Sequence, residues 1–483
     1  NEDVAYADGT YYSTLDAALT AASSSEETEV TITVLESCSI GQSITIPDGK
    51  TFTLTAAADD GITITDTGRY GMTANGSLTM ENITFITNGR IALNATQTGG
   101  PFGREITFRN VTLKMDGEMY SFSGGGYYSC AIFADSPALF VFDNCNVEIK
   151  NYPSTGAAIR WNGSNADRGY GVEFLNKTKF VSDGNYAGFI GTLDMLIDDS
   201  EVQVLNSRGY GSNGTFYTIT NGSDVLFDGN TDWGISANEL TMTKGATLIA
   251  TDNGRSGVWA RALNVDSTCT LTVEGNGYGF ESNMSNFEET GSFGSATGAT
   301  SNAGITYWGK SGVTSTIEAG ANVTIRNNAG SGISALQGIC NLTMLSGTIT
   351  NNGAESAIYG GGVFGIGTFT LGPDVVIYNN HASKAGDDIY FAPTNGTRTL
   401  TFGAVGNGWF LDGTPDCEDL IDGWYDDSAN ARWEAHSVPT HVEEIEPSNY
   451  PLGGVAALKA AHGLNPIQPG DETVNWEISK SKE

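Results

Sequence analysis

A unit of roughly 22 to 35 residues recurs through most of this 483-residue chain, and it restricts the fold more than any other feature. Each copy has an alternating apolar and polar run, a short turn containing Asn, Gly or Asp, and a second alternating run. The clearest copies are 78–85 (LTMENITF), 106–113 (ITFRNVTL), 140–149 (FVFDNCNVEI) and 172–180 (VEFLNKTKF), with later ones at 196–204, 240–249, 316–325, 342–349 and 369–377.

The turns explain how such a unit coils. Alternation with period two buries one face of each strand. Asn is tolerated in the left-handed backbone conformation that a sharp bend requires, and Gly adopts it freely. A third short strand, such as 131–134 or 257–260, follows a loop of variable length. Three strands and three corners predict an all-β, parallel β-helix solenoid of about eleven to twelve rungs. The predicted corner residues are Asn82, Asn110, Asn144, Asn176, Gly245, Gly320 and Gly347.

The two ends of the chain depart from the repeat. Ser13-Thr14-Leu15-Asp16 matches a capping box and predicts a short amphipathic helix over 17–22 that covers the first coil. We therefore expect an N-terminal cap at 1–30, the β-helix at 31–405, and a C-terminal cap or linker to further domains at 406–483. Within this last segment, 453–462 (GGVAALKAAH) predicts a terminal helix.

Composition excludes several classes of function. The chain carries 56 acidic and 23 basic residues, for a net charge of −33, so we expect neither nucleic acid nor anionic membrane surfaces as partners. It has no apolar run of about 18 residues, so no membrane insertion is expected in this segment. Its six cysteines form no C-x-x-C pair, and we expect most of them to be small buried residues.

Residues suited to catalysis are few. Glycoside hydrolysis needs two carboxylates across one cleft. The only candidates are Asp198 and Asp199, with Arg160 as a cation, and a solvated turn is the simpler interpretation of the two aspartates. The first 380 residues contain no histidine, so the repeats cannot supply a Ser-His-Asp triad.

Metal ligands are equally sparse. His436 and His441 share a segment with Glu434 and Glu443, without zinc-site spacing. We expect no cofactor. Calcium is the one ion that fits the acidic tail, although the order of the acidic residues there matches no EF-hand. The calcium candidates are Asp416, Glu418, Asp419, Asp422, Asp426 and Asp427.

The third-strand column predicts a binding surface. Alternation places Ile132, Ile159, Val258, Ile305 and Ile358 inward, so their neighbours point outward along one side. Trp259 beside Arg261 is the pair we single out, and the aromatic insertion 275–312 adds an adaptable surface suited to stacking on sugars. The alternative is that long loops cover this face. The outward set comprises Phe133, Arg160, Trp259, Thr306, Ser334 and Tyr359, and the flanking loops add Trp161, Tyr278, Phe280, Tyr307 and Trp308.

Three segments carry a resemblance to a known family: 360–363 (GGGV), 376–380 (VIYNN) and 385–390 (AGDDIY). With the rung pattern, they make the chain resemble the pectin-lyase-like superfamily of right-handed parallel β-helices, and more narrowly the adhesin-like surface proteins of Gram-positive gut bacteria. Hydrolases of this superfamily use Asn-Thr-Asp, Asp-Asp, Gly-His-Gly and Arg-Ile-Lys elements on successive turns. Asp198-Asp199 is the only match to the second element at a plausible location, no Gly-His-Gly exists, and no Arg-x-Lys lies downstream in a rung.

The resemblance implies an extracellular protein on the bacterial cell surface, as part of a longer, cell-wall-anchored chain. We expect a non-enzymatic adhesin whose partner is a host glycan or a host protein such as mucin or immunoglobulin. A polysaccharide lyase or glycoside hydrolase on the same fold and a passive surface stalk remain as alternatives, because fold does not imply function.

Overall fold

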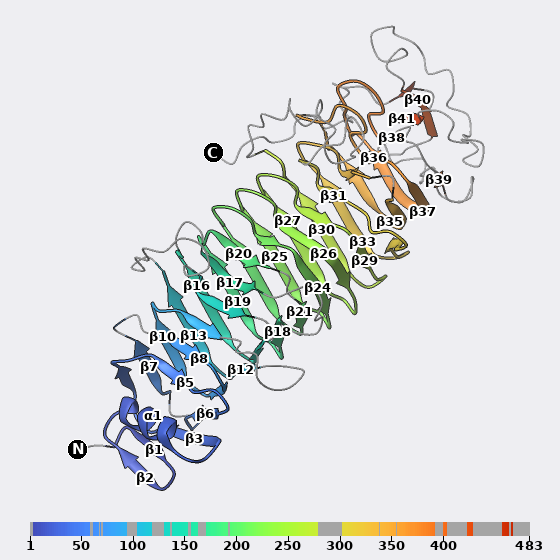
Figure 1. The fold of residues 1–483 in the computed structure, drawn as a ribbon. Helices are drawn as coiled ribbons and strands as arrows, with labels where there is room; N and C mark the ends of the chain where they lie inside the picture. The colour runs from blue at the N-terminus through green and yellow to red at the C-terminus, as the bar shows by residue number, and fades with distance from the viewer. Residues whose placement is uncertain are drawn as a thin grey trace. The chain divides into compact units, whose positions relative to one another are not determined.

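The computed structural model describes residues 3–57, 61–66, 68, 71–93, 104–117, 130–135, 138–152, 156–162, 171–191, 194–278, 302–337, 339–353, 355–391, 399–402, 423–427, 456–462 and 465–466. Over these residues the chain is a parallel β-solenoid of about 11 turns, as the repeat predicts (Figure 1). It divides into two compact units, Asn1–Leu226 and Phe227–Glu483, which we call unit 1 and unit 2.

Unit 1 stacks its strands in three parallel columns, one strand of each column per turn. The first column contains β3 (Glu29–Val34), β6 (Thr51–Thr55), β9 (Ser77–Glu81), β12 (Arg104–Arg109), β15 (Ala138–Asp143), β18 (Gly171–Leu175), β21 (Asp194–Asp198) and β24 (Thr215–Thr220). The second contains β4 (Cys38–Ile40), β7 (Thr63–Asp66), β10 (Thr84–Thr87), β13 (Thr112–Asp116), β16 (Asn146–Lys150), β19 (Lys179–Asp183) and β22 (Glu201–Leu205). The third contains β5 (Ile44–Ile46), β8 (Met72–Ala74), β11 (Ile91–Leu93), β14 (Ile132–Asp135), β17 (Ala157–Asn162), β20 (Ala187–Ile190) and β23 (Ser212–Asn213).

The N-terminal cap has the predicted helix. Helix α1 (Leu15–Ser24) begins after Thr14, whose hydroxyl accepts a hydrogen bond from the Ala17 N–H at 3.2 Å. Its buried face packs against β1 (Ala5–Ala7), β3 and β5. Strand β1 pairs antiparallel with both β2 (Thr10–Tyr12) and β3. An antiparallel strand and a helix therefore cover the edge that a parallel solenoid would leave open.

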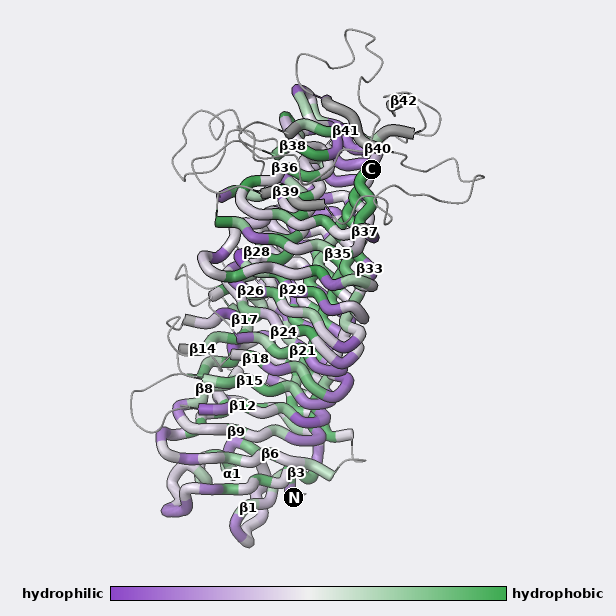
Figure 2. Tube along the Cα trace, turned by 90° about the vertical axis from the view of Figure 1, so that its right-hand side faces the viewer, coloured by the Kyte–Doolittle hydropathy of each residue, from purple (hydrophilic) through white to green (hydrophobic). Residues whose placement is uncertain are grey.

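Alternating burial builds the core, as the period-two pattern predicts. Figure 2 shows the hydropathy of the residues along the same strands. Most strands of the first two columns bury every second residue, and the buried residues of neighbouring rungs meet. Phe108, Phe142 and Phe174 stack on successive rungs with centroids 5.2 and 5.4 Å apart. The offset stacking of aromatic rings adds to the gain from burying their area.

The corners adopt the predicted left-handed conformation. Asn tolerates positive φ because its short polar side chain bonds locally, whereas most residues would be strained there. The predicted corner residues have these φ values: Asn82 58°, Asn110 53°, Asn144 52°, Asn176 53°, Gly245 77°, Gly320 91° and Gly347 131°.

Unit 2 has the same architecture of stacked parallel strands; β25 (Asp224–Asp228) spans the boundary between the units. One column contains β26 (Ile235–Met242), β28 (Val258–Ala260), β31 (Ile305–Tyr307), β34 (Ile333–Ala335), β36 (Val363–Gly365) and β38 (Ile389–Phe391). The C-terminal half of β26 pairs with β29 (Leu263–Val265), followed by β32 (Ser315–Ile317), β35 (Asn341–Thr350), β37 (Thr368–Tyr378) and β39 (Thr399–Phe402). The last column, β27 (Thr247–Thr251), β30 (Thr270–Glu274) and β33 (Asn322–Arg326), ends on β35 and β37.

A buried ladder of asparagines joins the rungs of unit 2. The side-chain N–H of each member donates to the side-chain oxygen of the next, and so does its backbone N–H. Asn328, for example, donates to Asn352 Oδ1 at 2.8 Å and to Val273 O at 3.1 Å, and accepts two bonds from Asn276. Both amide hydrogens are therefore used, as burial requires. The ladder comprises Asn230, Asn253, Asn276, Asn328, Asn352 and Asn380.

The ladder ends on a buried carboxylate instead of another asparagine. Asp388 Oδ1 accepts two bonds from Asn380, and Oδ2 accepts the Ala460 N–H at 2.7 Å. Beside it, Lys459 Nζ lies 2.7 Å from Asp387 Oδ2, and both of these side chains are fully buried. Burial raises the pKa of Asp388 to about 7.

These contacts hold a strand in the C-terminal segment, and they overturn one prediction. The expected terminal helix over 453–462 is wrong: β41 (Ala456–His462) is a strand that pairs antiparallel with β38 and with β40 (Gly423–Asp426), and β42 (Asn465–Pro466) pairs with it in turn. The open edge of β38 is a stronger partner for this segment than its own helix propensity.

The cysteines fit the predicted role where they are described. Cys130, Cys145, Cys269 and Cys340 are free and buried, and Cys38 is free and partly buried. Burial raises the pKa of the Cys145 thiol to about 11, so it stays protonated at neutral pH.

Candidate ligand-binding surface

The rings of three tryptophans lie next to one another on successive rungs of unit 2, each pair tilted by 35° or 41°, and we call them the tryptophan diagonal. Trp259 lies in the middle of β28, in register with Ser236 and Thr306 of the neighbouring strands. Trp233 precedes β26 and Trp308 follows β31, so the run crosses the column obliquely. The ring centroids of Trp233 and Trp259 lie 6.3 Å apart, and those of Trp259 and Trp308 5.7 Å. All three side chains are partly exposed.

A cation, Arg255, lies beside the first tryptophan of the diagonal and is paired with a carboxylate. The Arg255 guanidinium lies 5.6 Å from the centroid of the Trp233 ring, a cation–π contact. Arg255 Nε also lies 3.4 Å from Asp232 Oδ1. Burial raises the pKa of Asp232, and Arg255 opposes that shift. These contacts fix the orientation of the first tryptophan in the diagonal.

A second ion pair belongs to the same strands. Lys310 Nζ lies 2.5 Å from Glu239 Oε1, and joins the segment after β31 to β26. Arg261, which follows β28, is exposed. The strands that carry the diagonal and the segments next to them therefore also carry charged donors and acceptors. Flat apolar rings with polar groups around them suit ligands that present both C–H faces and hydroxyl groups.

The structure corrects the exposure predicted for several residues. Thr306, Ser334 and Tyr307 are buried, with at most 1% of their surface exposed. Strands β31 and β34 are buried on both faces, so the one-sided alternation that holds elsewhere fails there. Tyr307 has the same parity as Ile305, so its side chain points inward, and its hydroxyl donates to Asn341 O at 2.8 Å.

The predicted residues of unit 1 form a separate group. Phe133 and Trp161 are also buried, at 7% and 5% exposed. Arg160 is partly buried on β17, where its guanidinium lowers the pKa of the Cys130 thiol against the larger effect of burial. These three residues therefore lie in a different compact unit from the tryptophan diagonal.

Other predicted residues of unit 2 lie outside the diagonal. Tyr359 is partly exposed and stacks with Tyr390, their centroids 4.5 Å apart, while Lys384 Nζ lies 5.7 Å from its ring. Tyr278 is partly buried, and burial raises its pKa. Phe280 lies outside the described residues.

The catalytic candidates occupy a corner and a separate sheet. Asp199 is exposed, with a φ of 45°, at the bend that follows β21. Asp198 Oδ1 accepts a hydrogen bond from Asn221 Nδ2 at 2.6 Å. Arg160 belongs to the sheet of the third column, and Asp198 to the sheet of the first. The two aspartates thus have the surroundings of a solvated turn.

The calcium candidates fall mostly in segments that the structure does not describe. Asp416, Glu418, Asp419 and Asp422 lie outside the described residues, as do His436 and His441, and the side chain of Asp426 is not described. Asp427 is buried, and its Oδ2 accepts the Asp387 N–H at 2.8 Å. Within the described part of the chain, no group of three His, Cys, Asp or Glu side chains is arranged to hold a metal ion.

Sequence reasoning missed Trp233, which contacts Trp259, and the charged residues Asp232, Arg255, Glu239 and Lys310. Trp233, Asp232, Arg255 and Lys310 lie in turns and loops outside the aligned strands, whereas Glu239 lies within β26. Their one shared signal was proximity in sequence to the third-strand column.

No family model, no curated protein and no solved structure matches the chain. Among the described residues, no helix is both long and apolar enough to span a membrane.

Proposed function

We propose that this protein is a non-enzymatic adhesin that binds a carbohydrate chain through the tryptophan diagonal of unit 2. The observation that carries the proposal is the partly exposed, adjacent rings of Trp233, Trp259 and Trp308. Large rigid aromatic side chains supply contact area at a low cost in conformational entropy, and they dominate many binding surfaces.

The setting of the diagonal supports a carbohydrate. A sugar ring presents apolar C–H groups on its faces and hydroxyls at its edge. Trp259 offers the apolar surface, while Arg261 and the Lys310–Glu239 pair offer donors and acceptors for the hydroxyls. A host protein is the other ligand class, and the experiment below separates the two.

The wider assignment belongs to the same proposal. The rung pattern, the 360–363 element and the 376–380 element support a pectin-lyase-like, right-handed β-helix displayed on the surface of a Gram-positive gut bacterium. The dispersed positions of Asp198, Asp199 and Arg160 favour binding over catalysis.

A glycan array tests the proposal, using the whole chain and two variants. Trp259→Ala removes the middle of the diagonal, and Tyr11→Ala is the matched control, because Tyr11 is an exposed aromatic, 60% exposed, in the N-terminal cap. We expect Trp259→Ala to weaken glycan binding by at least about tenfold, as for other aromatic hot spots, and Tyr11→Ala to leave it unchanged.

Other results would overturn the proposal. If both variants bind glycans equally well, the tryptophan diagonal is not part of the binding site. Binding to host proteins after complete deglycosylation, with no glycan retained on the array, would replace the carbohydrate with a protein ligand. New reducing ends or an unsaturated sugar product would make the protein an enzyme.

A further inference from the structure

A polar groove of about 570 Å3 follows one set of corners in unit 1. It lies where β9, β12 and β15 turn into β10, β13 and β16, and it extends to the next turn, between β18 and β19. Its volume falls within the range of small-molecule sites. It belongs to a different unit from the tryptophan diagonal, so it concerns a second activity.

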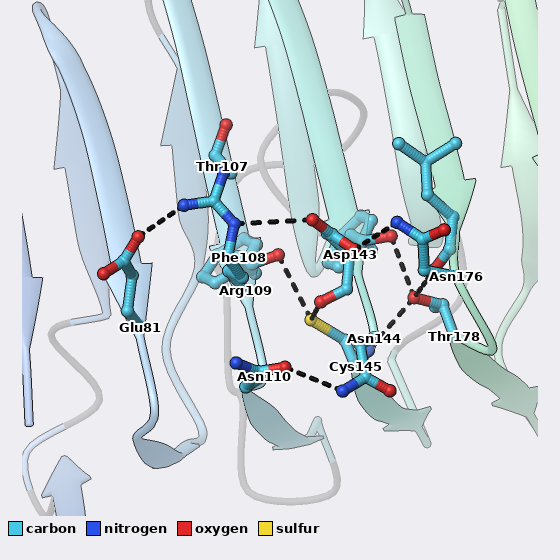
Figure 3. A network of polar contacts seen from close by, with 12 residues as sticks. Glu81, Thr107, Phe108, Arg109, Asn110, Asp143, Asn144, Cys145, Asn176 and Thr178 are labelled. Atoms are coloured by element: carbon cyan, nitrogen blue, oxygen red, sulfur yellow. Dashed lines mark hydrogen bonds and ion pairs between the residues drawn. The ribbon is translucent and has the colours of Figure 1, made fainter. Parts of the chain in front are cut away.

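The corner asparagines form a ladder in this groove that is only partly used (Figure 3). Asn110 Nδ2 donates to Asn82 Oδ1 at 3.1 Å, and Asn144 Nδ2 donates to Asn110 Oδ1 at 2.7 Å. The ladder stops there, because Asn176 donates to Asp143 Oδ1 instead. A carboxamide has two N–H donors and an oxygen with two lone pairs, so each member keeps capacity for a ligand.

The corner asparagines of unit 1 differ from the buried ladder of unit 2, whose side chains use their hydrogen-bonding groups on one another and on the backbone. In the buried ladder, Asn328 uses both amide hydrogens and accepts two bonds. In the groove, the side chains of Thr84, Thr112 and Asn146 make no hydrogen bond with any other described residue. Unpaired donors and acceptors therefore recur along three consecutive rungs.

The corner at the last rung is one residue longer than the corner before it. Asp143 and Asn146 align with Leu175 and Lys179, which leaves three residues between strands where the previous rung has two. The added residue, Lys177, has a φ of 67° and its side chain is exposed. It lines the groove without an ion pair to any described residue.

Hydrogen bonds hold this longer corner in place. The Lys177 N–H donates to Asp199 O at 2.5 Å. The Thr178 hydroxyl accepts the Cys145 N–H at 3.0 Å and lies 2.8 Å from Phe142 O. Lys179 lines the same end, and its Nζ lies 3.0 Å from Glu201 Oε2. Two ammonium groups therefore mark one end of a groove whose remaining lining is neutral, with Asn and Thr side chains beside Ile62, Ile83, Val111 and Cys145.

From this arrangement we infer that the groove binds a phosphorylated sugar or polyol. The hydroxyls of the ligand meet the Asn and Thr side chains, which both donate and accept, and its phosphate meets Lys177. A lysine ammonium binds a phosphate as a point charge, and no arginine lines the groove. A net charge of −33 makes a free lysine here the local exception.

Isothermal titration calorimetry on the whole chain tests the inference, with a hexose 6-phosphate as the probe. The unphosphorylated hexose, inorganic phosphate and a hexuronate are the comparison ligands. Lys177→Asn removes the charge and keeps a residue that tolerates positive φ. Lys244→Asn is the matched control, because Lys244 is also exposed and has a φ of 54°, but does not line the groove.

We expect the hexose phosphate to bind more tightly than any comparison ligand. Lys177→Asn should weaken it by up to about fivefold, the cost of one charge contact at an exposed site, and Lys244→Asn should leave it unchanged. Thr112→Val, which removes a groove hydroxyl at constant shape, should weaken the hexose phosphate and leave inorganic phosphate unaffected.

The inference fails if the wild-type chain gives no binding heat with the hexose phosphate, or if Lys177→Asn binds it as the wild type does. Inorganic phosphate binding as tightly as the ester would reduce the groove to an adventitious anion site. A hexuronate that binds as tightly as the hexose phosphate would refute the inference that the ligand carries a phosphate. None of these outcomes depends on whether the tryptophan diagonal binds glycans.

Discussion

Asn328→Ala tests the buried asparagine ladder of unit 2. Asn328 is fully buried, and its side-chain oxygen accepts both the backbone N–H of Asn276 at 3.0 Å and the Asn276 Nδ2 at 2.9 Å. The alanine variant leaves those two donors without their partner. An orphaned buried donor costs about 1–3 kcal/mol, so we expect unit 2 to lose about 2–6 kcal/mol of unfolding free energy.

The matched control is Asn322→Ala, on the strand of the same rung. Asn322 is exposed, and its one side-chain hydrogen bond, to Thr270 Oγ1, is 3.5 Å long. We expect a change within about 0.5 kcal/mol, as for other surface substitutions. Urea unfolding gives the free energies, and hydrogen exchange at the Asn276 amide shows whether the loss is local. If Asn328→Ala costs no more than Asn322→Ala, the ladder does not hold the rungs together.

Three further predictions concern the corners and the C-terminal cap. Thr178→Val should lower the unfolding free energy by about 1–3 kcal/mol in urea, because the Cys145 N–H loses its acceptor, whereas Thr178→Ser should retain most of the stability. Asn110→Ala should cost about 1–2 kcal/mol in the same assay, because alanine is strained at a φ of 53°, and Asn110→Gly should cost less. The pKa of Asp388 is raised from 3.8 to about 7, so its favourable contribution is complete below pH 3.8 and is lost as the pH rises through about 7. Urea unfolding across that window should show unit 2 losing stability with rising pH, and the neutral variant Asp388→Asn should flatten that slope; an unchanged slope would contradict the assignment.

Local chemistry made much of the fold predictable from the sequence. Asn82 and its counterparts occupy the bends because few other residues tolerate positive φ, so a single residue type identifies each corner in the sequence. The N-terminal helix was predictable for a similar reason, since its cap and its apolar face are both local. The C-terminal strand was not: the Ala460 N–H meets Asp388, a partner far away in the sequence.

The candidate site was only partly predictable. Trp259 stood out because it lies within a strand whose parity could be read. Trp233 and Trp308 lie beyond strand ends, and loops of unequal length separate the rungs, so their adjacency to Trp259 depends on contacts that no local pattern encodes. Thr306 and Ser334 were predicted to be exposed but are buried, because their strands are buried on both faces and the alternating pattern therefore does not mark an exposed side.

We propose above that the tryptophan diagonal binds a glycan and does not catalyse a reaction on it. The most direct measurement is a titration of the 15N-tryptophan-labelled chain with the glycan that binds best on the array, following the indole N–H signals. We expect the signals of Trp233, Trp259 and Trp308 to shift together along one saturation curve, while the glycan is recovered unchanged. Shifts confined to other tryptophans, or a cleaved glycan, would contradict the proposal.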